Sequence, residues 1–154
     1  MRTIGTGLTV AAVASGTTAA GIAIAEPDPR VAIAAPITIE TVVGRGTDTS
    51  VDNGRKGEGV GDSFITTRAK ISDPSTRSKV GSVDILGTIA SRSSNFVAIT
   101  ARLRGGTVQV NGVMRHDRAP TVLAVTGGTG DFENARGTLT LNERTQRATF
   151  KLLP

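Results

Sequence analysis

Apolar and polar residues alternate along most of the chain from residue 37 onward. Because successive side chains of a β-strand point to opposite faces, each alternating segment has one apolar and one polar face. No window keeps a helical period for longer than one turn. The pattern therefore predicts an all-β domain of about eight strands, at residues 37–43, 64–71, 80–90, 95–104, 107–116, 121–126, 137–143 and 146–153.

The apolar faces indicate how these strands assemble. Antiparallel strands in sequence order close most simply into an eight-stranded up-and-down β-barrel with the apolar face inside, because closure removes both unpaired edges. We assign no charged residue to the inner face. Such a barrel is either filled by its own side chains or holds one small apolar molecule, and both alternatives stay open. The residues expected to line a ligand-binding lumen are Ile65, Ile85, Val97, Ile99, Val110, Leu123 and Phe150.

The first 25 residues differ from the alternating part of the chain. A short positive start precedes an uncharged stretch at 4–25 that is rich in Ala, Gly, Val and Ile and ends in Ala-Ile-Ala. This is typical of a secretory signal peptide at 1–25, and it predicts a secreted, extracytoplasmic protein with no stable membrane insertion after signal removal. The alternative is a membrane span, for which the segment is long enough but too rich in Gly, Thr and Ser. Residues 26–36, with three prolines, form an extended arm before a barrel domain at 37–154.

Composition limits the classes of function. Removal of residues 1–25 from the 154 leaves 129, which is enough for one domain. The chain has no cysteine, so burial and backbone pairing must stabilise an exported protein without disulfides. Its basic residues are scattered near acidic ones, and four Phe with no Tyr or Trp leave little for base stacking, so we expect no nucleic-acid partner. Fourteen arginines against four lysines, with much Ala and Gly, indicate a bacterial genome of high GC content.

The sequence indicates neither a metal nor a cofactor. One histidine and no cysteine provide no zinc or iron ligand set. Asp48, Ser50 and Asp52 have the spacing that opens a calcium loop, but Asn53 stands where glycine is needed and Gly59 where a bidentate Glu is needed. We therefore expect no bound metal and no cofactor.

A glycine-rich segment, GGTGDFENARG at 127–137, separates two of the predicted strands. Glycine adopts positive φ without steric cost, so the segment predicts a structural turn between them. It fits neither the dinucleotide-binding nor the P-loop spacing, and its acidic residues would repel a phosphate. The residues assigned to this turn are Gly127, Gly128, Gly130, Gly137 and the apolar Phe132.

The same segment resembles the GGTGxFxxARG turn of the allene oxide cyclase and dirigent-like barrel family. The sequences GDSF at 61–64 and KVG at 79–81, and the strand and turn at 103–112, follow in that family's order. The resemblance implies an eight-stranded barrel with an apolar lumen, in dimers or trimers, that cyclises or steers reactive intermediates. Residues 121–123 are TVL where plant dirigents tend to bring an Arg-Glu pair, so the resemblance transfers the fold and the pocket but no catalytic residue.

The only histidine, His116, precedes Asp117 and Arg118 in the loop after the predicted fifth strand. In an up-and-down barrel this loop lies at the same end as the long loop 45–61. A histidine beside an aspartate can act as a general acid or base, although adjacent loop residues are also often only solvated. The residues that could ring this mouth are His116, Asp117, Arg118, Asp48, Asp52, Arg55 and Glu58.

Three functions remain open for such a barrel. It is a cyclase, isomerase or dirigent-like guide for an apolar molecule, a non-catalytic carrier of the lipocalin kind, or a structural cell-envelope protein with a filled core. A lumen void of about 300 Å³ or more would favour the first two functions. A polar group pointing into that void would favour an enzyme over a carrier. The apolar molecule, and a second or third copy of the chain, are the expected partners.

Overall fold

The computed structural model describes residues 35–54 and 56–153. Within this part of the chain, no helix has the length and hydropathy needed to cross a membrane. The predicted signal peptide and residues 26–34 of the predicted arm lie outside the described residues. The strands are β1 (Ile37–Val43), β2 (Thr47–Val51), β3 (Ser63–Ser72), β4 (Lys79–Ser91), β5 (Ser94–Leu103), β6 (Gly106–Arg115), β7 (Thr121–Gly130), β8 (Arg136–Asn142) and β9 (Arg147–Leu153).

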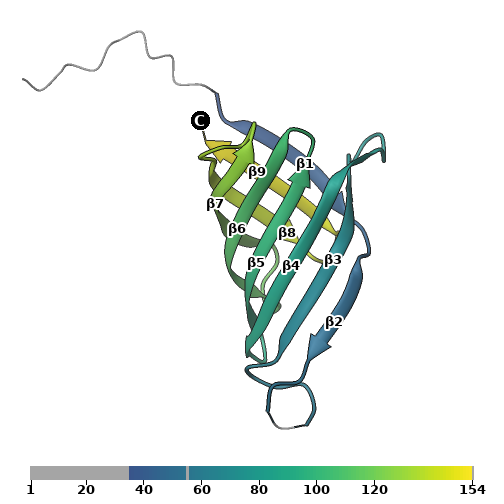
Figure 1. Ribbon diagram of the computed structural model, residues 1–154, viewed down its shortest axis with the longest axis vertical. Helices are drawn as coiled ribbons and strands as arrows, with labels where there is room; N and C mark the ends of the chain where they lie inside the picture. Colours follow the sequence, from purple (N-terminus) through teal and green to yellow (C-terminus); the bar gives the residue numbers. More distant parts are fainter. Residues whose placement is uncertain (1–34, 55, 154) are drawn as a thin grey trace, which may run out of the picture. The chain divides into compact units, whose positions relative to one another are not determined.

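The strands form one antiparallel sheet that closes on itself (Figure 1). From β3 to β9 each strand pairs with its neighbours in the chain, and β9 pairs with β1. The ring closes between β1 and β3, where Val42 lies opposite Ser72 and Val43 opposite Ile71. The predicted eight-stranded antiparallel barrel is therefore confirmed, with β1 and β3–β9 as its strands.

The remaining strand, β2, lies in the segment 45–61 that was predicted to be a loop, and that part of the prediction is wrong. All of β2 is exposed, and it pairs only with β3, from Thr47 opposite Thr67 to Val51 opposite Ser63. A strand that buries neither face needs no apolar stripe. The alternation that predicts the other strands is therefore missing here.

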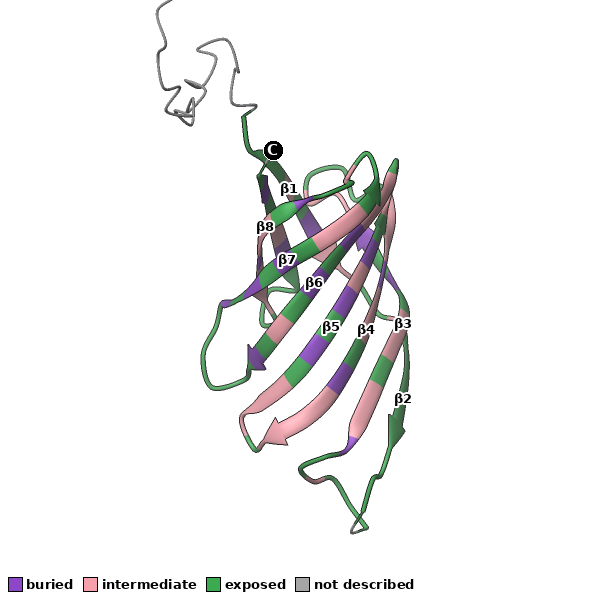
Figure 2. Cartoon of the chain, turned by 60° about the vertical axis from the view of Figure 1, so that its left-hand side comes forward, coloured by how far each residue is buried: buried purple, intermediate pink, exposed green. Residues whose placement is uncertain are grey.

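Burial alternates along the strands of the wall, most regularly along β5, β6 and β7 (Figure 2). The buried residues point into the barrel and form one hydrophobic core, in which a fully buried Leu or Phe side chain contributes about 1.5–3 kcal/mol. The core residues are Ala69, Ile71, Val83, Val97, Ile99, Ala101, Val108, Val110, Met114, Leu123, Val125, Ala135, Leu139, Ala148, Phe150 and Leu152.

The predicted inward placement of Ile65 is wrong. Its side chain is 38% exposed, and its cross-strand neighbour Leu86 is 51% exposed. The register with β4 shifts between Thr66 and Ala69, where Arg68 has a φ of +55°. One extra residue in a strand reverses the parity of the residues before it. Ile65 therefore faces outward, although Ala69 faces inward.

The glycine-rich segment reverses the chain where predicted, but the turn is shorter than expected. Only residues 131–135 make the reversal. A strand that is mostly glycine shows no apolar alternation, so the end of β7 is not visible in the pattern. The strands on either side of the reversal include the predicted turn glycines Gly127, Gly128, Gly130 and Gly137.

This reversal packs tightly against the turn between β5 and β6. Gly130 has a φ of +64°, and a Cβ at this position would collide with the backbone oxygen of Gly105. The amide of Asp131 donates to the same oxygen over 3.0 Å. Phe132 packs against the core, as predicted for an apolar plug, and Ala135 is buried in it. The 131–135 turn therefore seals one end of the barrel.

Candidate functional site

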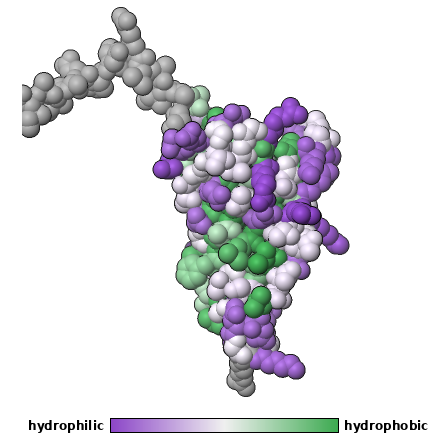
Figure 3. Space-filling model, in the orientation of Figure 1, coloured by the Kyte–Doolittle hydropathy of each residue, from purple (hydrophilic) through white to green (hydrophobic). Residues whose placement is uncertain are grey.

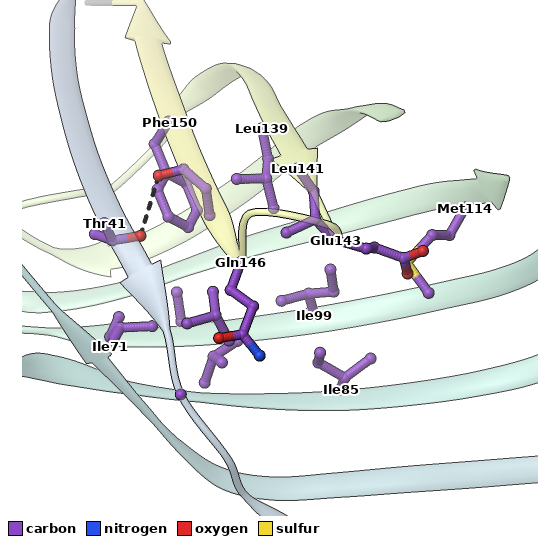
Figure 4. A pocket seen from close by; sticks show the side chains of 15 residues that line it. Thr41, Ile71, Ile85, Ile99, Met114, Leu139, Leu141, Glu143, Gln146 and Phe150 are labelled. Carbon is purple, nitrogen blue, oxygen red and sulfur yellow. Dashed lines mark hydrogen bonds between the residues drawn. The ribbon is translucent and has the colours of Figure 1, made fainter. Parts of the chain in front are cut away.

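An apolar cavity of about 180 Å³ lies inside the barrel, near the end of β1 and the turn between β8 and β9 (Figure 4). This volume falls below the threshold of about 300 Å³, and by that measure it favours a structural barrel with a filled core over an enzyme or a carrier. It exceeds the roughly 150 Å³ of an apolar protein cavity that binds benzene. The cavity is lined by Thr41, Val43, Gly44, Ile71, Val83, Ile85, Ile99, Ala101, Met114, Leu139, Leu141, Glu143, Gln146, Ala148 and Phe150.

The structure separates the predicted lumen residues into three groups. The cavity is lined by Ile85, Ile99 and Phe150, the adjoining core contains Val97, Val110 and Leu123, and the outer wall carries Ile65.

Two polar side chains of the β8–β9 turn, Glu143 and Gln146, line the cavity (Figure 4). The turn is tight: the amide of Gln146 donates to the Glu143 carbonyl over 3.3 Å, and Gln146 has a φ of +55°. A third polar residue, Thr41, uses its hydroxyl to donate to the Ala148 carbonyl over 3.1 Å. The cavity is thus apolar on most sides, with an ionisable group at one edge.

Glu143 is a site residue that the sequence reasoning missed. It follows Leu139 and Leu141 at intervals of two, so it continues the inward column of β8 by one step. His116 likewise follows Met114 on β6, and Asn95 precedes Val97 on β5. The parity that predicts the core could therefore have found Glu143 and Asn95 as well as His116. The expectation that no charged residue lies on the inner face is wrong at Glu143.

A chain of hydrogen bonds joins these three residues across the mouth of the barrel. Nε2 of His116 lies 2.9 Å from the Asn95 side-chain nitrogen, and Nδ1 lies 3.2 Å from Oε2 of Glu143. The Asn95 amide nitrogen can only donate, so Nε2 accepts and Nδ1 carries the proton that it donates to the carboxylate. The bond uses one of two carboxylate oxygens, which leaves Oε1 able to accept a bond from a ligand. Solvent reaches the pair, since the two side chains are 40% and 42% exposed.

The predicted neighbours Asp117 and Arg118 do not share this network. Asp117 accepts two hydrogen bonds from Arg115, of 3.0 Å from Nε and 2.6 Å from Nη2. These bonds, more than the nearby charge of Arg118, lower the pKa of Asp117. The carboxylate partner of His116 is therefore Glu143 and not the adjacent Asp117.

The other predicted mouth residues are spread over the same end of the barrel and its outer face. Asp52 accepts the amide of Gly57 over 2.9 Å, and Asp48 accepts the hydroxyl of Thr66 over 2.7 Å. Arg55 lies outside the described residues. In the described part of the chain, no three His, Asp or Glu side chains gather as a metal site would require.

Glu58 lines a second hollow, of about 300 Å³, outside the apolar cavity. His116 and Asn95 form part of the wall of this outer hollow, and Glu143 forms part of the wall of the cavity. The hydrogen-bonded pair therefore stands between the two spaces. The outer hollow is lined by Glu58, Gly59, Val60, Ile89, Ser91, Arg92, Asn95 and His116.

No family model matches the chain, and no curated protein matches it. Among solved structures, a pyocyanin demethylase is similar with a TM-score of 0.66 and 24% identity, over 75% of this chain and 99% of that one. A nonspecific heme-binding cyclase that catalyses a [4 + 2] cycloaddition during neoabyssomicin biosynthesis is similar with a TM-score of 0.51 and 11% identity. That match covers 77% of this chain and 65% of the cyclase. The chain thus shares its barrel fold with two enzymes that its sequence does not closely resemble.

Proposed function

We propose that the barrel binds an apolar ring in its cavity and moves a proton on the bound molecule through Glu143, as an isomerase or cyclase. The observation that carries this proposal is the 3.2 Å bond between His116 and Glu143 at the edge of an apolar cavity. In general acid–base catalysis, a carboxylate positioned beside the bound substrate commonly transfers the proton. The two similar folds, a demethylase and a cyclase, add support from proteins of the same architecture.

The proposed step needs no group from outside the chain. Glu143 takes a proton from a C–H bond of the ligand, and the electron pair of that bond moves into the ligand's conjugated system. The same proton then returns to a different ligand atom, so atoms and electrons balance. The Nδ1–H of His116 holds the carboxylate in place throughout, and Asn95 holds the ring of His116.

A base-catalysed ring opening tests this role without knowledge of the natural substrate. In 5-nitrobenzisoxazole, removal of the proton on the carbon next to nitrogen forms a nitrile and breaks the N–O bond, which releases a coloured phenolate. We expect the protein to accelerate this reaction and Glu143→Gln to slow it by about a hundredfold.

Glu40→Gln is the matched control, because Glu40 is an exposed carboxylate on β1. Its rate should equal that of the unmodified protein. Equal rates for Glu143→Gln and the unmodified protein would exclude Glu143 as the base.

A non-catalytic carrier is the second candidate, favoured by the aliphatic lining of the cavity. A carrier would bind an apolar ring as well, but Glu143→Gln would leave the rate of the probe reaction unchanged.

We also propose that the chain is a distant relative of the allene oxide cyclase and dirigent-like barrels. We also propose that the protein is exported. The mass of the mature protein, cut after residue 25, tests this.

A second copy of the chain is the partner that we propose for the outer wall. Apolar side chains gather over β4, β5 and β6 (Figure 3), where Phe96 is 59% exposed and lies opposite Val113. Contiguous exposed apolar surface is typical of interfaces. The ion pair of Asp84 and Arg102 brings both charge signs to the same wall, which suits a self-complementary contact. Phe96→Lys should convert an oligomer to a monomer in light scattering, and a monomeric unmodified protein would contradict the proposal.

A further inference from the structure

The apolar cavity and the outer hollow share a wall at the His116–Glu143 pair. His116 lines the outer hollow, Glu143 lines the cavity, and a hydrogen bond of 3.2 Å joins them. The cavity, at about 180 Å³, has room for one ring system. A larger ligand that places a ring there and extends past the pair enters the hollow of about 300 Å³.

We propose that the two spaces form one two-part site for an amphipathic ligand, with its apolar ring in the cavity and a cationic tail in the outer hollow. This inference rests on the proposed function, because it requires the cavity to bind the ring. To the proposed function, this inference adds the size and the charge of the ligand. The cavity alone determines neither.

The charge of the outer hollow indicates the sign of the tail. Its wall carries the carboxylate of Glu58 and the guanidinium of Arg92, and the carboxylate of Glu143 stands at the junction. Both ring nitrogens of His116 are already hydrogen-bonded, Nε2 to Asn95 and Nδ1 to Glu143. The two carboxylates of Glu58 and Glu143, against the single guanidinium of Arg92, favour a positively charged tail.

The same geometry predicts where the proposed chemistry takes place. A ligand that occupies both spaces lies beside the pair, so Glu143 faces the ligand atoms that join ring and tail. The ring lies beyond it among Ile85, Ile99 and Phe150. A substrate of this site should therefore react at the carbon that links its ring to its tail.

Three probes with the same ring separate the two parts of the site. Indole has no tail, tryptamine has a cationic tail and indole-3-propionate has an anionic tail. In calorimetric titrations, we expect tryptamine to bind at least about threefold more tightly than indole, and indole-3-propionate to bind more weakly than indole. Glu58→Gln should reduce the advantage of tryptamine and leave indole binding unchanged, whereas Glu40→Gln should change neither.

The outcomes distinguish this inference from the proposed function. If indole binds but tryptamine gains nothing, or if Glu58→Gln leaves the gain intact, the two-part site is wrong and the ring-binding cavity stands. If none of the three probes binds, the cavity does not hold a ring and the proposed function is wrong as well.

Discussion

The two ends of the barrel are built from similar strand connections but end in different side chains. At the sealed end, the 131–135 turn packs Phe132 and Ala135 against the core and joins the β5–β6 turn through the Asp131 amide. At the open end, the inward columns finish in Asn95, His116 and Glu143, with an apolar cavity behind them. The difference is that a packed turn closes one end, whereas polar and ionisable side chains beside a cavity end the inward columns at the other.

This contrast separates stability from function along the barrel. Changes at the sealed end should lower the free energy of unfolding and leave ring binding unchanged in the folded protein. Changes at the open end should alter binding or the probe reaction, whatever their smaller effect on the free energy of unfolding. The first two of the following substitutions each test one side of that division.

Gly130→Ala should produce the largest loss of stability. The new Cβ would meet the Gly105 backbone at a residue whose φ is +64°, and both effects together cost roughly 2–4 kcal/mol. Urea unfolding measures the loss. Gly127→Ala is the control within the same segment, since a Cβ there meets nothing within 4 Å, and equal stability of the two variants would contradict the sealed end.

Ala148→Leu should fill part of the cavity at the open end. Ala148 is buried in the cavity wall, and the larger side chain should weaken indole binding by at least about tenfold. The stability change should stay below about 3 kcal/mol, because the void accepts much of the added volume. Ala124→Leu, on the exposed face of β7, is the control, and unchanged indole affinity in Ala148→Leu would place the ring elsewhere.

Asp73→Asn should give the smallest effect, a loss of stability that is present at neutral pH and disappears at low pH. Hydrogen bonds from the Ser75 hydroxyl and the backbone amides of Thr76 and Ser75 lower its pKa to about 2. The folded pKa lies below the unfolded value of about 3.9, so the contribution to stability is present above pH 4 and is lost as pH falls toward 2. The difference in stability between the unmodified protein and Asp73→Asn should shrink over that range, and a difference that grows on acidification would show the opposite sign.

Most of the fold was predictable because one physical rule, alternation across a half-buried strand, governs eight of the strands. The rule failed where its premise fails. Strand β2 buries neither face, the end of β7 is largely glycine, and the bulge at Arg68 reverses the parity that placed Ile65 inside. A bulge is visible only once the partner strand is known, so a single sequence does not reveal it.

The candidate site was predictable in part. His116 was placed at the mouth of the barrel, but its partner was sought in the adjacent Asp117 and found 27 residues away at Glu143. Parity identifies Glu143 as the next inward position after Leu141. Whether such a residue points into a cavity depends on the conformation of the turn, here the positive φ of Gln146, which the residue types around it do not indicate.

An NMR titration of the folded protein with indole tests the central claim most directly. The open-end cavity should show the largest shift changes, at Ile85, Glu143, Gln146 and Ala148, while the 131–135 turn should show almost none. Shift changes confined to the outer wall around Leu86 and Phe96, or no change at any residue, would contradict a ligand-binding open end.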